Sequence, residues 1–379
     1  TDLYTPFNRY YAVAAEEVIN KSAETIKAAK RPLLLLGAGA NRKEARRAIS
    51  DFIHQIGIPF CNTQMGKGAV DASSEYFLGT AALSDKDYLH DYIKHADLII
   101  NIGHDVVEKP PFFMEHGGTT VIHINYKSAM VDQVYFPQIE VVGDIALSIT
   151  ALTDTIGENL KLDLSDFEKV KSNVRQKLFE NSDDASFPMK PKRVVSDIRN
   201  IMGYHDIIAL DNGVYKIWFA RNYPAFQPNT VLLDNALATM GAGLPSAMTA
   251  AMLFPERKVM SICGDGGFMM NSQELETAVR LKLNLVVLIL NDNSYGMIRW
   301  KQAGMGFDDW GLEYNNPDFI MYAKSYGAHG HRIENSESFS EVLSQAFKKG
   351  GVHLIDLPID YSENVKDLIS DLSSHQSIL

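Results

Sequence analysis

The chain has 379 residues, of which 46% are hydrophobic and 22% charged, and its net charge is -11 at neutral pH. A chain of this length predicts two or three domains, each with a core of its own, and this composition excludes a disordered protein. Its apolar runs are too short to span a membrane, and its negative charge disfavours binding to nucleic acid or to anionic lipid.

The N-terminus, Thr1 to Tyr4, has neither an initiator Met nor a leader that is first charged and then apolar. We therefore expect the chain to be a fragment of a longer protein. Cys61 and Cys263 are the only cysteines in the sequence, and both lie in apolar runs. Two such cysteines make neither a disulfide framework nor a zinc site, which indicates a reducing, cytoplasmic location.

The first series of predicted elements extends from Pro32 to Gly143. Short apolar strands alternate there with amphipathic segments, which is typical of a parallel sheet covered by helices. We therefore predict a Rossmann-like central α/β domain over residues 1–156. Its predicted strands are residues 33–36, 58–61, 98–102, 121–124 and 139–142.

A glycine pair, Gly37 and Gly39, follows the first of these strands. The pair resembles part of a dinucleotide-binding fingerprint, which also needs a third glycine at the start of the helix and an acidic residue at the end of the second strand. The third glycine is missing, and the second strand ends in Cys61 and Asn62. We therefore favour a tight strand-to-helix turn that requires small residues.

Residues 157–192 are charged and contain no predicted strand. We interpret them as an interdomain linker with one helix at Ser165–Glu180. The second α/β series predicts another doubly wound parallel-sheet domain over residues 193–360, followed by a polar surface tail at 361–379. The predicted strands of this second domain are residues 207–211, 231–233, 259–263, 285–290 and 352–357.

Two polar loops of the second domain each follow a predicted strand. The first contains Gly264, Asp265, Gly266 and Gly267, and the second contains Asp292. The spacing accommodates one helix near residues 273–281 and a returning strand, so both aspartates would reach the same edge of the sheet.

Carboxylate oxygens suit Mg²⁺, and glycines allow backbone N–H groups to approach a diphosphate at the start of a helix. The pattern therefore predicts a magnesium-diphosphate site. The alternative is that Asp265 and Asp292 are unrelated helix-capping residues.

The order of these motifs resembles the signature of thiamine-diphosphate enzymes: Gly-Asp-Gly, then a helix and an apolar strand, then an Asn-Asp or Asn-Asn pair. The resemblance covers nearly the whole chain. The segments Leu237–Pro245 and Pro358–Asn364 are similar to acetolactate synthase catalytic subunits, especially those of the catabolic branch. The resemblance implies a central domain, a diphosphate-binding domain, and a transferase that condenses two pyruvates to 2-acetolactate with loss of CO₂. Another 2-oxoacid remains open as the acceptor.

The resemblance also implies roles for individual residues. Asp265, Asp292 and the carbonyl of Ser294 would bind Mg²⁺. Met240 and Ala238 are the expected catalytic residues: the Met240 side chain would hold the cofactor in a bent conformation, and the Ala238 carbonyl would accept a hydrogen bond from the cofactor's amino group. Without the resemblance, Met240 would be a core residue. The expected cofactor-binding residues are Gly213, Val214, Tyr215, Ala238, Met240, Gly264, Asp265, Gly266, Gly267, Asp292, Ser294, Tyr295, Gly296 and Met297.

Two stretches depart from the family's pattern. This chain has Val214 and Tyr215 where the family commonly has a small or amide side chain and then His. We expect the side-chain contacts to the diphosphate to differ there. The segment Gly103–Pro111 lacks the Phe-Asp-Asp-Arg stretch of the flavin-containing members and resembles the flavin-independent catabolic type. We therefore do not expect bound FAD.

The resemblance finally implies partners. The family uses a glutamate from an N-terminal pyrimidine-binding domain that belongs to the other subunit of a dimer, so a homodimer or homotetramer is expected. The residues before Pro32 are too few to form that domain, and we expect this chain by itself to be inactive. Two alternatives remain open: a thiamine-dependent 2-oxoacid decarboxylase that releases an aldehyde, and a nucleotide-binding regulatory module.

Overall fold

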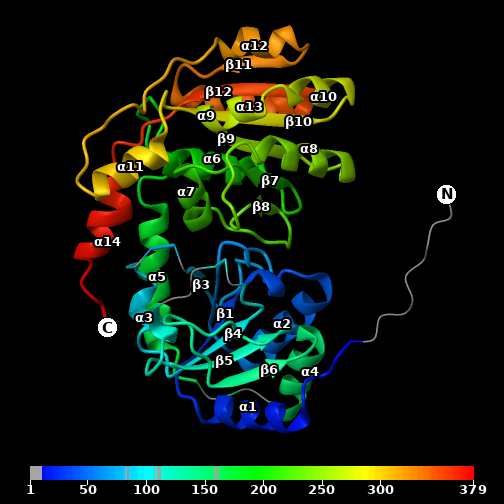
Figure 1. Cartoon of the computed structure of the whole chain (residues 1–379), viewed down its shortest axis with the longest axis vertical. Coiled ribbons are helices and arrows are strands. Elements are labelled where there is room, and N and C mark those ends of the chain that lie inside the picture. Colours follow the sequence, from blue (N-terminus) through cyan, green and yellow to red (C-terminus); the bar gives the residue numbers. More distant parts are fainter. Residues whose placement is uncertain are drawn as a thin grey trace, which may run out of the picture.

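The computed structural model describes residues 11–379 apart from residues 82, 85, 106, 109–111, 158–159 and 161. The described chain forms two α/β domains, each built around a six-stranded parallel sheet with helices on both faces (Figure 1). The strand orders are β3-β2-β1-β4-β5-β6 in the first domain and β11-β12-β10-β9-β7-β8 in the second. The expected fold class, α/β with two doubly wound parallel-sheet domains, is confirmed.

In the first domain, apolar strands pack between two layers of helices. Helices α1, α2 and α4 cover one face of the sheet, and α3 and α5 cover the other. Every residue of β1 and β4 is buried, because a parallel sheet covered on both faces hides all its side chains from water. The elements are α1 (Glu16–Ala28), β1 (Pro32–Leu36), η1 (Ala38–Ala40), α2 (Lys43–Ile56), β2 (Phe60–Asn62), β3 (Phe77–Thr80), α3 (His90–Ile93), β4 (Leu98–Ile102), η2 (Phe112–Met114), β5 (Thr120–Asn125), β6 (Ile139–Val142), α4 (Ile145–Ile156) and α5 (Ser165–Phe179).

The second domain repeats this arrangement. Helices α6, α7 and α13 pack on one face of its sheet, and α8, α10 and α12 pack on the other. The elements are α6 (Pro191–Ile201), β7 (Ile207–Leu210), α7 (Tyr215–Asn222), β8 (Val231–Leu233), α8 (Gly243–Leu253), β9 (Val259–Gly264), α9 (Asp265–Met270), α10 (Glu274–Arg280), β10 (Leu285–Asn291), α11 (Gly296–Gly304), α12 (Phe319–Ser325), β11 (His329–Arg332), α13 (Ser336–Lys349), β12 (Val352–Pro358), η3 (Lys366–Ser370) and α14 (Asp371–Ser374).

Each predicted strand is present, with ends that differ by at most two residues. Two strands, β3 and β11, were not predicted. Both lie at the edge of a sheet and pair with a single neighbour. Strand β11 has the sequence His-Gly-His-Arg and is only partly buried, so it carries no apolar run that would predict a strand.

A carboxylate of the protein itself lies against the Gly37–Gly39 turn of the first domain. The Glu108 carboxylate accepts hydrogen bonds from the backbone N–H groups of Ala38 (3.0 Å) and Asp105 (3.1 Å) and from the Thr63 hydroxyl. A Cβ atom added to Gly37 would lie 2.7 Å from both the Glu108 carboxylate and the Gly103 carbonyl. The glycine is thus required by close packing, which supports the structural interpretation of this turn.

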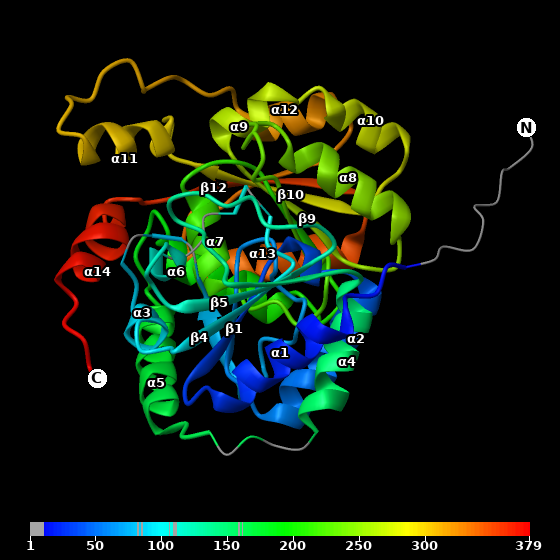
Figure 2. The ribbon, with the colours of Figure 1, turned by 60° about the horizontal axis from the view of Figure 1, so that its bottom comes forward.

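The linker and the tail are more closely packed than the sequence suggested. Helix α5, expected at this place, buries Phe167 and Val170 in the core of the first domain. The segment after Asp360 is anchored to the rest of the protein: Leu368 and Leu372 are buried, and Nε2 of His375 lies 2.8 Å from the Asp91 carboxylate in the first domain. Figures 1 and 2 both show this C-terminal segment beside α5. The exact domain boundaries stay a prediction.

Within the described part of the chain, no helix combines the length and the apolar character that a membrane span requires. Cys61 and Cys263 are buried and unpaired.

Lys67 is buried at the contact between the two domains, with 3% of its surface exposed. Its Nζ donates hydrogen bonds to Oγ1 of Thr80 (3.0 Å) in the first domain and to the carbonyl of Ala220 (2.9 Å) in the second. Among the described residues, no carboxylate forms an ion pair with it. Burial therefore lowers the pKa of Lys67 to about 7.

We expect Lys67→Met to flatten the pH dependence of stability. Between pH 7 and 10 the unfolded chain binds the lysine proton and the folded chain does not, so the free energy of unfolding of the wild type should rise with pH across this window. In the variant, the free energy of unfolding should rise by about 1.4 kcal/mol less per pH unit than in the wild type. At pH 7 the variant should be more stable than the wild type. Urea unfolding at several pH values measures this slope, with the exposed Lys43→Met as control. Equal slopes for wild type and Lys67→Met would contradict the prediction.

Candidate functional site

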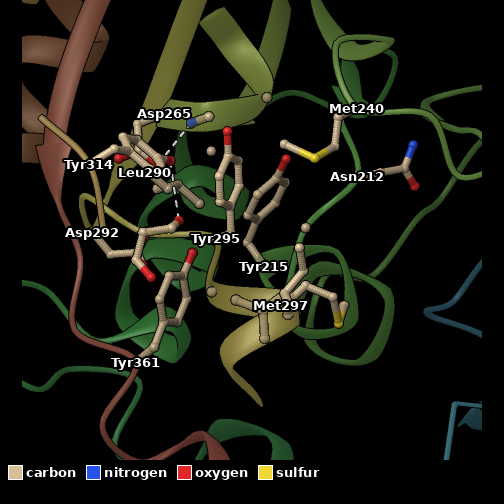
Figure 3. Close-up of a pocket in the computed structure, with 18 residues that line it drawn as sticks. Asn212, Tyr215, Met240, Asp265, Leu290, Asp292, Tyr295, Met297, Tyr314 and Tyr361 are labelled. Atoms are coloured by element: carbon tan, nitrogen blue, oxygen red, sulfur yellow. Dashed lines mark hydrogen bonds between the residues drawn. The ribbon is translucent and has the colours of Figure 1, made fainter. Parts of the chain in front are cut away.

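The candidate site lies at the carboxyl edge of the second sheet. Strand β7 pairs with β8 on one side and with β9 on the other, so the direction of winding reverses between β7 and β9. Ligands of open α/β sheets bind at such switch points. A pocket opens there between the loops that follow β7, β9 and β10 (Figure 3).

Nearly all the site residues expected from the sequence line this pocket. They are Gly213, Val214 and Tyr215 after β7, Met240, the four residues Gly264–Gly267, and Asp292, Ser294, Tyr295, Gly296 and Met297 after β10.

Ala238 is the exception. It is exposed and does not line the pocket, although it lies two residues before Met240. Its φ angle of +49° is in the left-handed region, which is uncommon for a residue with a Cβ atom. The expected role of its carbonyl stays a prediction.

Asp265 is held rigidly at the centre of this arrangement. It is the first residue of α9 and is 1% exposed. Its Oδ1 accepts hydrogen bonds from the Gly266 N–H (3.0 Å) and the Tyr314 hydroxyl (2.9 Å), and its Oδ2 accepts one from Nδ2 of Asn316 (2.6 Å). Burial raises the pKa of Asp265, and these hydrogen bonds act against the increase.

Asp292 lies close enough to Asp265 for the two carboxylates to interact electrostatically. Burial and, secondly, the charge of Asp265 raise the pKa of Asp292 to about 7, while Arg299 lowers it. A carbonyl is available beside the carboxylates, because the Tyr314 hydroxyl that reaches Asp265 also lies 3.3 Å from the Ser294 carbonyl. Two carboxylates and one carbonyl are hard oxygen donors, so this donor set fits Mg²⁺. No group of three or more His, Cys, Asp or Glu side chains arranged for a metal occurs among the described residues.

The glycines after β9 leave no room for side chains. A Cβ atom on Gly267 would lie 2.2 Å from the Asp211 carboxylate, and one on Gly266 would lie 2.6 Å from the Tyr314 hydroxyl. The two glycines are therefore required by close packing against Asp211 and Tyr314, and both also line the pocket. This geometry fits the close approach of a diphosphate to backbone N–H groups.

Asp211 is a residue to which the sequence analysis assigned no role. It is fully buried at the end of β7, and its carboxylate accepts hydrogen bonds from the N–H groups of Gly241 and Ala242, both at 3.0 Å. It thereby fixes the segment that carries Met240. Its position directly after a buried strand was the signal that could have identified it.

Tyrosines that the sequence analysis did not select form part of the pocket wall. Tyr314 and Tyr361 line it, and the buried Tyr361 hydroxyl has no hydrogen-bond partner within the described chain. In the view of Figure 3, the rings of Tyr215 and Tyr295 lie between the two aspartates and Met240. The unpartnered hydroxyl is a group that a polar ligand could satisfy.

Asn316 orients the aspartate that is expected from the sequence to bind Mg²⁺, so its removal should weaken that binding. Besides Asp265, its Nδ2 group also contacts Oδ1 of Asn291 and of Asn293, both at 3.1 Å. We expect Asn316→Ala to reduce the affinity for Mg²⁺ in the presence of thiamine diphosphate by about 10- to 100-fold, as is typical for partners of metal ligands. Titration calorimetry measures the change. The neighbouring Asn315→Ala, at an exposed position, is the control and should bind like the wild type; equal losses in both variants would contradict the orienting role.

Comparison with known proteins agrees with the position of the pocket. Residues 211–357 match the description "Thiamine pyrophosphate enzyme, C-terminal TPP binding domain", and residues 19–152 match "Thiamine pyrophosphate enzyme, central domain". The two matches together account for most of the chain.

Several curated proteins are similar over nearly the whole chain. The acetolactate synthase of Bacillus subtilis (strain 168) is 32% identical over 368 residues, which cover 94% of this chain and 63% of that protein. The catabolic acetolactate synthase of Raoultella terrigena is 33% identical over 357 residues, which cover 93% of this chain and 64% of that protein. The acetolactate synthase isozyme 2 large subunit of Escherichia coli (strain K12) is 27% identical over 372 residues, which cover 95% of this chain and 66% of that protein. The chain thus spans somewhat less than two thirds of the length of these relatives.

Proposed function

The chain belongs to the thiamine pyrophosphate enzymes, and from this membership we propose that the complete protein condenses two pyruvates to 2-acetolactate with loss of CO₂. The observation that carries the proposal is the pocket at the switch point of the second sheet. It brings Asp265, Asp292 and Ser294 to one wall and Met240 to another. The similarity to acetolactate synthases supports pyruvate as the substrate.

The residues of the pocket would divide the binding of the cofactor among them. Asp265, Asp292 and the Ser294 carbonyl would hold Mg²⁺, and backbone N–H groups of the segment from Gly264 to Gly267 would lie against the diphosphate. When bound, thiamine diphosphate supplies the electron sink for decarboxylation of the 2-oxoacid.

The other residues of the pocket would set the position of the cofactor and limit access of water. Met240, partly exposed to the pocket, would support the middle of the cofactor. The rings of Tyr215 and Tyr295, together with Met297, would exclude water from the reacting atoms.

We further propose that the complete protein is a cytoplasmic homodimer or homotetramer. The buried, unpaired state of Cys61 and Cys263 supports a reducing compartment. The oligomeric state follows from the resemblance, in which a pyrimidine-binding domain of a second subunit completes the site. Analytical ultracentrifugation of the complete protein measures it, and a monomer at all concentrations would reject this part of the proposal.

Cofactor binding and conversion of pyruvate test the proposed function in two separate experiments. Calorimetric titration should show that thiamine diphosphate binds in the presence of Mg²⁺ and not in EDTA, whereas thiamine monophosphate, ADP and FAD bind much more weakly. Preferred binding of ADP would instead support a nucleotide-binding module. The complete polypeptide encoded by the gene should then convert pyruvate to acetolactate. Release of acetaldehyde without acetolactate would identify a decarboxylase and overturn the proposed condensation.

A further inference from the structure

Lys216 is a buried lysine to which the proposed function assigns no task. It is the second residue of α7, and only 8% of its surface is exposed. Buried lysines are normally paired with a carboxylate, but within the described chain Lys216 forms no ion pair. Burial lowers the pKa of Lys216 to about 8, and the carboxylates of Asp234 and Asp211 act against the decrease. The side chain therefore carries its charge at pH 7.

The ammonium group of Lys216 donates three hydrogen bonds, which is the full number that a lysine can donate. Its acceptors are Oδ1 of Asn212 (2.8 Å), Oδ1 of Asn235 (2.8 Å) and the Asp234 carbonyl. Asn212 lies in the loop after β7, whereas Asp234 and Asn235 begin the loop after β8. Lys216 thus connects the loop after β7 to the loop that leads to Met240.

Two of the residues that Lys216 contacts hold the remainder of this loop. Nδ2 of Asn212 donates to the Thr239 carbonyl (2.9 Å). The Asp234 carboxylate accepts hydrogen bonds from the N–H groups of Ala236 (3.1 Å) and Thr239 (3.2 Å). Figure 3 shows Asn212 on the same side of the pocket as Met240. Both backbone polar groups of Thr239, the residue before Met240, are therefore fixed.

The loop adopts a backbone conformation that requires such support. The φ angle of Ala238 is +49°, in the left-handed region that is costly for a residue with a Cβ atom. Costly backbone conformations persist where the surrounding contacts over-determine them. The hydrogen bonds at Ala236 and Thr239 enclose Ala238 on both sides. The strained residue thus lies within the network, two positions before Met240.

From these contacts we propose that Lys216 is a positioning residue, which holds the loop after β8 so that Met240 meets the cofactor correctly. The inference rests on the proposed function, because Met240 has this task only with thiamine diphosphate bound. Lys216 is not among the residues that line the cofactor pocket, so it acts through Asn212 and Asp234. Without its three donors the loop relaxes and Met240 moves, and a misplacement of about 1 Å costs on the order of a hundredfold in rate.

Hydrogen exchange of this chain tests the positioning without any cofactor. Lys216→Met keeps most of the length of the side chain and removes its donors. The amides of residues 236–241 should exchange at least about tenfold faster than in the wild type, and those of β9 and β10 at the wild-type rate. Unchanged exchange of residues 236–241, or an equal increase throughout the second domain, would overturn the proposal.

Lys258→Met is the matched control for the exchange experiment. It also removes a lysine of the second domain that donates to a backbone carbonyl, that of Ile201 (2.7 Å). Lys258 precedes β9 and therefore lies at the opposite end of this strand from the pocket. Exchange of residues 236–241 in this variant should be that of the wild type.

The turnover of the complete protein tests the consequence for the reaction. Lys216→Met should lower kcat for acetolactate formation by about 10- to 100-fold and change the affinity for thiamine diphosphate by less than about threefold. Wild-type turnover in this variant would show that Lys216 does not position Met240. If the wild type itself formed no acetolactate, the proposed function would fail, and the exchange experiment would still decide whether Lys216 holds the loop.

Two further variants separate positioning from a general effect on stability. Asn212→Ala, at a partly exposed position, breaks only the connection to Thr239 and should also speed exchange of residues 236–241, even if Lys216→Met does not fold. Ala238→Gly removes the Cβ atom that makes the left-handed conformation costly. Added to Lys216→Met, it should restore turnover by about fivefold, a gain that a role of Lys216 in stability alone does not predict. Absence of any recovery in the folded double variant would reject the positioning role.

Discussion

Replacing Asp265 by Ala is expected to abolish the Mg²⁺-dependent binding of thiamine diphosphate. Asp265 is buried, and Tyr314 and Asn316 orient both of its oxygens. Backbone N–H groups alone would hold neither the metal nor the diphosphate well, because each depends on the other. Loss of one partner of a buried charged interaction costs about 2–5 kcal/mol, which corresponds to a loss of affinity between roughly thirtyfold and several thousandfold. Calorimetric titration with thiamine diphosphate, in Mg²⁺ and in EDTA, measures this loss.

Two further variants make the Asp265 result specific. Asp292→Asn should be milder, because an amide oxygen still coordinates Mg²⁺ and the family uses Asn at this position. Asp308→Ala removes an exposed carboxylate and should leave binding unchanged. Circular dichroism shows whether Asp265→Ala remains folded, since the change removes one hydrogen-bond acceptor each from Tyr314 and Asn316. If folded Asp265→Ala bound the cofactor with the affinity and metal dependence of the wild type, the metal assignment would be wrong.

Met240→Ala is expected to lower turnover strongly while the fold and diphosphate binding persist. The side chain lines the pocket and is only partly buried, so its truncation should cost less than the 2–5 kcal/mol typical of a core methionine. Its proposed task is to hold the cofactor in a reactive conformation, and a small misplacement of reacting groups costs on the order of a hundredfold in rate. The turnover number of the complete protein, the cofactor affinity and the melting temperature together test this expectation.

Two control variants distinguish a role of the Met240 side chain at the cofactor from a role in the stability of the fold. Met240→Leu keeps most of the volume and should retain more activity than Met240→Ala, whereas Met305→Ala, at a site that is 69% exposed, should behave like the wild type. A large decrease in melting temperature with full activity per folded molecule would instead assign Met240 to the core. That outcome would remove its role at the cofactor.

Much of the fold could be predicted from local patterns. Short apolar runs between polar segments, such as β4 and β10, are typical of strands buried on both faces of a sheet, and their length and flanking residues identified them. The convergence of Asp265 and Asp292 also followed, because the ends of parallel strands meet at one edge. The edge strands β3 and β11 could not be found in this way. Strand β11 is stabilised by pairing with β12 and not by apolar side chains of its own.

The sequence by itself thus determined the two α/β domains and the glycine and aspartate loops of the pocket. Only the tertiary structure decided which distant residues complete these loops. Tyr314, 49 positions after Asp265, orients the aspartate. Tyr361 lines the pocket from a segment that was expected on the surface. The physical reason is that periodicity reports how one element is buried. Contacts between loops depend instead on how whole elements pack, and no local pattern records that packing.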